Sequence, residues 1–193
     1  MSKIMLQPDF GWGKVKSAVV PAFTCCITAL LVVGCASKPV KRPSLDPNQV
    51  EKLQHQHLAN RLPVPVAGVS RQMLKDTWGA SRSSGRTHEG IDILAERGTK
   101  VYSTTSGVIA DLRDNRLGGK VIWVMGPAGS WHYYAHLDKH KRGLDVGDAI
   151  KKGDVIGYVG NTGNARHTSP HLHYGIYLGG KGRNAVNPYP YLR

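Results

Sequence analysis

A chain of 193 residues is long enough for one domain with a proper hydrophobic core, even after a leader and a linker are set aside. The formal net charge of +13 suits nucleic acid, an anionic membrane or an acidic polymer, but the basic residues form no recognisable nucleic-acid motif, and an acidic polymer is the better match. All three cysteines lie at or before Cys35, which excludes an internal disulfide from the rest of the chain and leaves any metal there to His and carboxylate ligands.

The first part of the chain, residues 1–34, has the pattern of a secretory signal peptide. Lys14 and Lys16 precede a mostly apolar run over residues 18–33, in the order of the charged and apolar regions of such a signal. Because the run approaches membrane-spanning length, a retained membrane anchor is the alternative.

The residues at the end of the apolar run favour the signal peptide. Val32-Val33-Gly34-Cys35 resembles the lipobox of bacterial lipoproteins, which implies cleavage before Cys35 and a lipid anchor, such as palmitate, on that residue. Ala36 and Ser37 resemble the outer-membrane sorting pattern. We therefore expect a lipoprotein anchored in a membrane of the cell envelope, facing the periplasm from the outer membrane.

A polar tether is expected over residues 35–61. Asp46 and Pro47 could begin a short helix there, with Asp as the cap and Pro in the first helical position. His55 and His57 are expected to be solvated. One further domain would then occupy residues 62–193.

From Pro63 onward, short apolar runs alternate with Gly, Asn and Pro turn signals, which is typical of strands rather than long helices. A short helical turn after Ser70 is the expected exception. The pattern predicts an all-β, antiparallel domain. The predicted strands cover residues 64–69, 91–94, 101–112, 121–125, 132–137, 155–159 and 171–178.

Two histidines of the last predicted strand should share one face. In an extended strand the side chains alternate between faces, so His171 and His173 point the same way while Leu172 points into the core. A single histidine, His136, occupies an earlier strand. Two imidazoles side by side on one face suggest a common ligand.

A carboxylate and a further histidine form the second cluster. Asp92 lies between Ile91 and Ile93, so its carboxylate should face a site while the two isoleucines face the core. His88 lies just upstream, and Gly90 lets the backbone bend so that both groups can reach one metal ion.

Histidine and carboxylate ligands suit Zn²⁺, and three protein ligands leave an open fourth position for water, as in catalytic zinc sites. A His-x-x-x-Asp pattern alone has low specificity, and a His-x-His pattern has moderate specificity. Their occurrence together, with a strand histidine between them, is more specific and predicts a Zn²⁺ site.

The sequence also resembles a known family. HEGID (88–92), YYAHL (133–137) and SPHLHYGI (169–176), in that order, are similar to the three signatures of LytM/lysostaphin-type endopeptidases, and the similarity extends from about Leu62 to Arg193. The resemblance implies an antiparallel β-sandwich with the metal in an open groove between loops.

The resemblance also implies a role for each site residue. The positions that bind zinc in this family are His88, Asp92 and His173 here. His136 and His171 take the catalytic positions, as general base and as proton donor, in an order that the sequence leaves open. Glu89 resembles the base of helical His-Glu-x-x-His zinc proteases, but no histidine follows four residues after His88, so we expect Glu89 to be a loop or surface residue.

Three further features lie near these positions. His132 would share a strand face with His136 if that strand is regular, and could then line the groove, support a ligand, or simply be a partly exposed strand residue. Ala80 replaces a tyrosine that many relatives carry. The segment 163–168 is longer than usual and should reshape one groove wall.

Together these features predict a zinc-dependent endopeptidase that hydrolyses the peptide cross-links of bacterial peptidoglycan during wall remodelling. A non-catalytic module that regulates another wall hydrolase, or a zinc protease acting on proteins, are the alternatives. Regulatory relatives have typically lost ligands or catalytic histidines, whereas this chain keeps all five.

Overall fold

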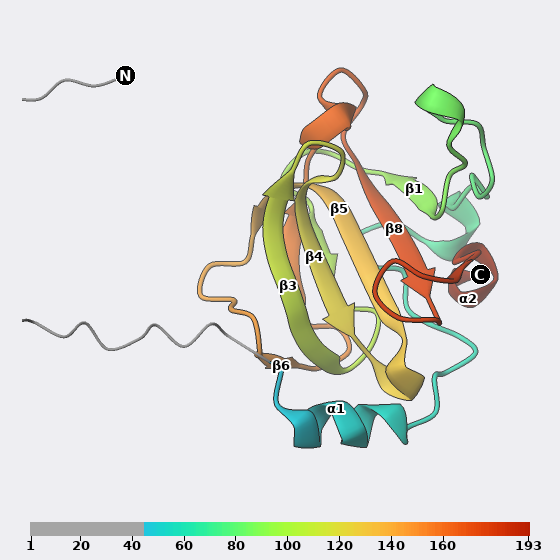
Figure 1. Cartoon of the computed structure of the whole chain (residues 1–193). Helices are drawn as coiled ribbons and strands as arrows, with labels where there is room; N and C mark the ends of the chain where they lie inside the picture. The colour runs from blue at the N-terminus through green and yellow to red at the C-terminus, as the bar shows by residue number, and fades with distance from the viewer. Residues whose placement is uncertain (1–44) are drawn as a thin grey trace, which may run out of the picture. The chain divides into compact units, whose positions relative to one another are not determined.

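The computed structural model describes residues 45–193 (Figure 1). The predicted signal peptide, Cys35 and the first residues of the tether lie outside the described residues. Within residues 45–193, no helix is long and apolar enough to cross a membrane. The elements are α1 (Pro47–Gln54), β1 (Ile91–Leu94), β2 (Lys100–Tyr102), β3 (Gly107–Asn115), β4 (Gly119–Met125), β5 (Trp131–His140), β6 (Ala149–Ile150), β7 (Val155–Val159), β8 (His171–Tyr177), β9 (Ala185–Val186) and α2 (Tyr189–Leu192), with short 3-10 turns at Arg71–Met73, Ser83–Gly85, Pro127–Gly129 and Gly163–Ala165.

The strands pair antiparallel throughout. The main sheet runs β1-β8-β5-β4-β3-β6, and β9 pairs with the C-terminal end of β8. β2 pairs with β7, and β7 also pairs with the last residues of β5, so β5 belongs to both groups of strands. The mostly antiparallel fold with few helices confirms the predicted fold class.

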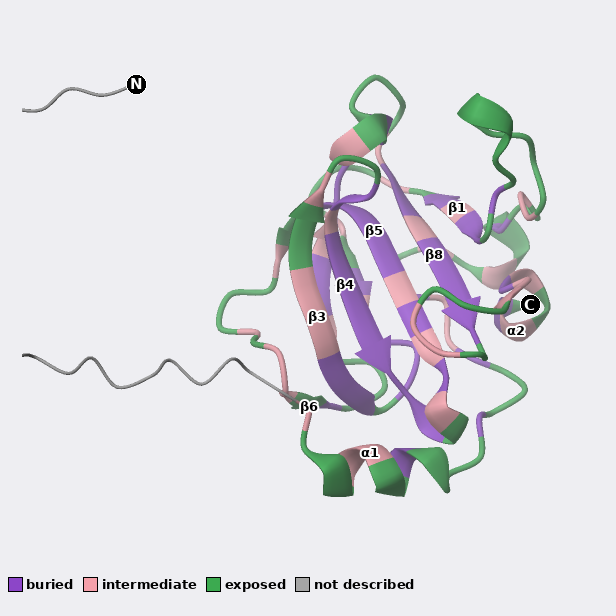
Figure 2. Cartoon of the chain, viewed as in Figure 1, coloured by how far each residue is buried: buried purple, intermediate pink, exposed green. Residues whose placement is uncertain are grey.

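The hydrophobic core draws on the inner faces of nearly all strands. Figure 2 shows β4 and β8 as mostly buried. As predicted, Leu172 lies in the core, together with Ile91 and Ile93 on the neighbouring β1. Burial of these apolar side chains holds β1 against β8, and this pair of strands carries Asp92, His171 and His173.

The predicted strand over residues 101–112 is divided in two. Residues 103–106 leave the sheet between β2 and β3, and the hydroxyls of Ser103 and Thr104 are buried. Thr104 Oγ1 lies 2.9 Å from the Tyr134 hydroxyl and 2.8 Å from the Tyr174 hydroxyl. The run over residues 64–69 forms only an isolated bridge from Val66 to Val101. The two-residue strands β6 and β9 were not predicted, because so short a strand leaves no alternation to detect.

The strand that carries His136 is not regular. Between Lys120 and Ile122 of β4, the facing residues of β5 shift from Leu137 to Tyr134, which leaves one extra residue in β5. This β-bulge turns His136, at φ 61°, to the opposite face from Tyr134 and from His132. The premise that His132 and His136 share a face is therefore wrong. His132 is fully buried in the interior rather than in a groove.

The helical expectations near the start of the described residues are confirmed. Asp46 caps α1, because its carboxylate accepts a hydrogen bond of 3.0 Å from the Asn48 amide. Arg71–Met73 forms the short turn after Ser70, although without a hydrogen bond from the Ser70 side chain. Leu58, within the predicted tether, is buried in the core of the domain.

Candidate metal centre and groove

The candidate site forms where β1 pairs with β8. In this pair, Asp92 lies directly opposite His173, so their side chains share one face of the sheet. His88 precedes β1. Its backbone lies against that of Ala80, because the His88 amide donates a hydrogen bond of 2.9 Å to the Ala80 carbonyl. The fold thus brings together the three residues that the sequence predicts as ligands.

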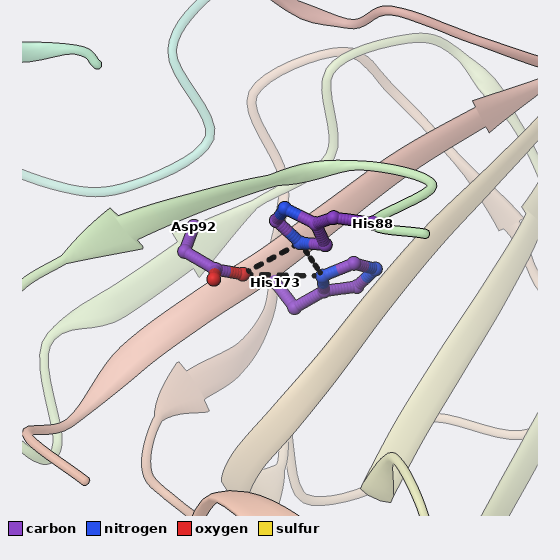
Figure 3. A group of neighbouring side chains, drawn as sticks. All are labelled: His88, Asp92 and His173. Atoms are coloured by element: carbon purple, nitrogen blue, oxygen red, sulfur yellow. Dashed lines mark hydrogen bonds and ion pairs between the residues drawn. The ribbon is translucent and has the colours of Figure 1, made fainter. Parts of the chain in front are cut away.

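The three side chains converge on one point (Figure 3). His88 Nε2 lies 2.8 Å from His173 Nδ1 and 3.0 Å from Asp92 Oδ1. His173 Nδ1 lies 3.2 Å from the same carboxylate oxygen. His88 is almost fully buried, and the other two are partly buried.

The chemistry of these donors fits a bound cation. His88 Nδ1 donates to the Thr77 carbonyl at 2.6 Å, which leaves a lone pair on its Nε2 in the neutral ring. Three electron-pair donors, His88 Nε2, His173 Nδ1 and Asp92 Oδ1, then face one another. At most one proton, on His173, is available to form a hydrogen bond among them. Tetrahedral Zn²⁺ with ligands at ~2.0–2.1 Å would place such atoms about 3.3 Å apart, close to the separations here. The residues present therefore fit Zn²⁺.

Neighbouring groups hold the ligands in place. The Thr77 hydroxyl accepts a hydrogen bond of 3.0 Å from the Asp92 amide, and Arg82 forms an ion pair with Asp92 Oδ2, the oxygen that faces away from the histidines. Gly90 is required for packing: a Cβ there would lie 2.6 Å from the Tyr174 carbonyl oxygen and 2.7 Å from Cε1 of His173. Gly90 thus acts through close approach to His173 rather than through an unusual φ.

The two remaining histidines line the same groove. His136 Nδ1 donates to the Thr162 carbonyl and His171 Nδ1 to the Ser169 carbonyl, each at 2.9 Å. In the neutral rings these bonds leave a lone pair on each Nε2. His171 Nε2 lies 3.9 Å from Asp92 Oδ1, and the His136 and His171 ring centroids are 5.0 Å apart. The predicted catalytic pair therefore lies beside the candidate ligands.

Burial and charge set the protonation of these groups. Burial raises the pKa of Asp92, but hydrogen bonds and charges from His173 and His88 outweigh burial and hold this pKa well below its usual range. Burial lowers the pKa of His173. Burial, helped by the charges of His173 and His171, lowers the pKa of His136 to about 4 despite the Thr162 hydrogen bond. Near neutral pH, His136 is uncharged and able to accept a proton.

The ligands and histidines open onto a groove of about 1080 Å³. Arg82 and Arg86 line it, as do Asn164 and Thr168 from the loop after β7. The segment 163–168 thus contributes to the groove lining, and its greater length than usual stays a prediction. Glu89 is exposed on the groove lining, in agreement with the expectation of a surface residue.

Several residues of the site had no signal in the sequence. Thr77, Thr162 and Ser169 orient the histidines through backbone carbonyls, and a carbonyl is present at every residue. No role in the site was predicted for Arg82 or Arg86. Their place could have been suspected only from their proximity to His88 in the sequence.

Comparisons with known proteins agree with this geometry. Residues 86–188 match the model of Peptidase family M23. The chain is 40% identical over 127 residues to the L-Ala--D-Glu endopeptidase of Bacillus subtilis (62% of this chain, 39% of that protein). It is 31% identical over 99 residues to the peptidoglycan DD-endopeptidase ShyC of Vibrio cholerae (51% of this chain, 22% of that protein). The match therefore spans well under half of either relative.

A solved structure shows the same fold. The catalytic domain of the antimicrobial peptidase lysostaphin from Staphylococcus simulans superposes with a TM-score of 0.56 at 30% identity, covering 62% of this chain and 92% of that domain.

Proposed function

Because the chain belongs to peptidase family M23, we propose that it is a zinc-dependent endopeptidase that hydrolyses peptide bonds in bacterial peptidoglycan. One observation carries the proposal: a complete ligand triad and two further histidines line one groove. The name of the Vibrio relative, a peptidoglycan DD-endopeptidase, supports peptidoglycan peptides as the substrate, and the name of the Bacillus relative, an L-Ala--D-Glu endopeptidase, supports the cleavage of internal peptide bonds.

His88, Asp92 and His173 would hold the zinc ion. When bound, Zn²⁺ supplies a Lewis acid that activates water and polarises the peptide carbonyl. The protein contributes ligand orientation: the Thr77 carbonyl fixes the His88 tautomer, and Arg82 fixes the second oxygen of Asp92.

The two other histidines would move the protons. His136 is neutral near pH 7 because burial lowers its pKa to about 4, so its Nε2 can take a proton from the attacking water. His171, whose Nε2 also faces Asp92, would deliver a proton from Nε2 to the departing amine when its ring carries a proton on both nitrogens. Both rings are held through Nδ1 by backbone carbonyls, which keeps each Nε2 directed at the groove.

The test separates a catalyst from a regulator. The zinc-loaded protein is incubated with cross-linked peptidoglycan, and conversion of dimeric to monomeric muropeptides is followed. His136→Ala and His171→Ala should each keep zinc but lose at least ~10²-fold in rate, because neither is a ligand and both transfer protons.

The outcomes of this assay are distinct. No conversion by the zinc-loaded protein, on a substrate that another endopeptidase cleaves, would favour a non-catalytic module that regulates another hydrolase. Activity that survives both histidine changes would preserve the enzyme and contradict the proton-transfer roles.

We also propose that the mature protein is a lipoprotein anchored through Cys35. Ala36 and Ser37, which resemble the outer-membrane sorting pattern, support the outer membrane as its location. The support is the lipobox-like Val32-Val33-Gly34-Cys35 after an apolar run. Cys35→Ser should abolish metabolic labelling with a fatty acid and move the protein out of the membrane fraction. Labelling that persists in this variant would contradict the anchor.

A further inference from the structure

A tight hairpin before β1 presents two arginines on one face. The Arg82 amide donates a hydrogen bond of 2.8 Å to the Arg86 carbonyl, so the two residues lie opposite each other across the turn Ser83–Gly85. Side chains alternate along each arm, so the face that carries both arginines also carries His88. Both arginines line the groove.

The two guanidinium groups differ in their partners. Like charges directly opposite each other repel, and Arg82 relieves this by pairing with Asp92. Arg86 has no such relief: no carboxylate of residues 45–193 lies within ion-pairing distance of it. Within this part of the chain, Arg86 is therefore a cation on the groove lining without an ion-pair partner.

The Arg86 side chain is nevertheless oriented by hydrogen bonds within its own turn. Its Nε donates to the Ser83 carbonyl and its Nη2 to the Ser83 hydroxyl, each at 3.2 Å. A guanidinium has five N–H groups, and two of them are used here, which leaves three for a ligand. An oriented guanidinium with free N–H groups is suited to bidentate binding of a carboxylate.

The wall across the groove offers no matching charge. The turn Gly163–Ala165 and the turn Ser83–Gly85 lie at the same end of the domain (Figure 1). The first contributes Asn164 and Ala165 to the groove, both uncharged, and the second contributes the arginines. A substrate in the groove would therefore meet the arginines on one side and no charged residue from the turn Gly163–Ala165.

We propose that Arg86 determines specificity by binding a free carboxylate of the substrate, so that the enzyme cleaves stem peptides with a free carboxylate beside the scissile bond in preference to their carboxamide forms. This inference rests on the proposed function, because it concerns the same groove. It names the substrate class as acidic peptides.

The experiment compares two synthetic stem peptides that are identical except for a free carboxylate or a carboxamide on the residue that follows the scissile bond. The zinc-loaded protein should show a kcat/KM at least ~10-fold higher for the carboxylate peptide, since loss of a bidentate, charge-assisted pair leaves polar groups unpaired. Arg86→Gln should remove this preference by slowing cleavage of the carboxylate peptide alone. Arg86→Lys, which keeps the charge, should retain part of it.

Arg142→Gln is the matched control, because Arg142 is exposed and does not line the groove. It should preserve the preference. Equal kcat/KM for the two peptides in the unchanged protein, or an undiminished preference in Arg86→Gln, would overturn the proposal.

A binding measurement separates this proposal from the proposed function. The same peptides are titrated by calorimetry into the zinc-free protein and its Arg86→Gln variant. Tighter binding of the carboxylate peptide, lost in Arg86→Gln, would support the role of Arg86 even if no peptide were hydrolysed. Equal binding of the two peptides by the unchanged protein would reject it even if both were cleaved. Thermal unfolding of the variant confirms that loss of the Ser83 hydrogen bonds has not unfolded the hairpin.

Discussion

Asp92 presents its two carboxylate oxygens to different partners. Oδ1 faces His88 and His173, and Oδ2 pairs with Arg82. Partners that orient a metal ligand typically contribute 10- to 100-fold to metal affinity. Arg82→Gln should therefore weaken Zn²⁺ binding by ~10-fold or more, measured by competition with a chromogenic chelator. Arg86→Gln, which removes the same charge from the opposite arm of the hairpin, should bind Zn²⁺ normally; equal affinities in the two variants would contradict the positioning role.

His132 links stability to pH. Burial lowers its pKa from 6.5 to about 3, so the unfolded chain binds a proton that the folded protein does not between these values. The contribution of the neutral His132 to the free energy of unfolding is therefore fully present above pH 6.5. It decreases as the pH drops toward 3, by up to ~1.4 kcal/mol per pH unit. His132→Gln should be less stable at pH 7, since His132 hydrogen-bonds Tyr174 and Ser130, yet lose less stability on acidification. Urea unfolding at several pH values measures this, and identical slopes for both proteins would reject it.

At the scale of elements, the bulge in β5 is held by one side chain. Thr162 Oγ1 accepts from the Lys120 amide at 2.9 Å and donates to the Leu137 carbonyl at 2.8 Å, on the two strands that the bulge disrupts. The Thr162 carbonyl accepts from His136. The same residue therefore closes the bulge and orients the histidine that the bulge turns toward the groove.

Removing the Thr162 hydroxyl should have two effects. Thr162→Val keeps the shape but leaves two main-chain groups unpaired, at a cost of about 1–3 kcal/mol in the free energy of unfolding. It should also slow peptide hydrolysis while Zn²⁺ affinity stays unchanged, because His136 is not a ligand. Thr162→Ser should restore both properties. The measurements are urea unfolding, muropeptide release and chelator competition; a loss of zinc in Thr162→Val would show that the bulge supports the metal centre instead.

The limits of sequence reasoning follow from these same elements. Strand alternation correctly placed Leu172 in the core and both His171 and His173 on the groove, because β8 is regular. Alternation failed for His132 and His136, because the extra residue of the bulge in β5 places the side chains before and after it on opposite faces. Amino-acid composition does not reveal such a bulge. The oriented carbonyls could not be predicted either, since they depend on how loops distant in sequence pack together.

At the scale of the whole molecule, the metal centre ties distant segments together. His88 and His173 are 85 residues apart in sequence, and the unfolded chain cannot hold them at one point. Zn²⁺ should therefore bind the folded state alone and stabilise it, by ~4 kcal/mol at a free concentration of a thousand times Kd. For a domain of this size that corresponds to a Tm increase of roughly 8–16 °C.

Differential scanning calorimetry with Zn²⁺ and with a chelator measures the increase. Asp92→Ala and His173→Ala should abolish it, whereas His171→Ala should keep it, because His171 lies beside the ligands without being one. A Tm increase that persists in both ligand variants would place the metal elsewhere in the chain and contradict the assigned centre.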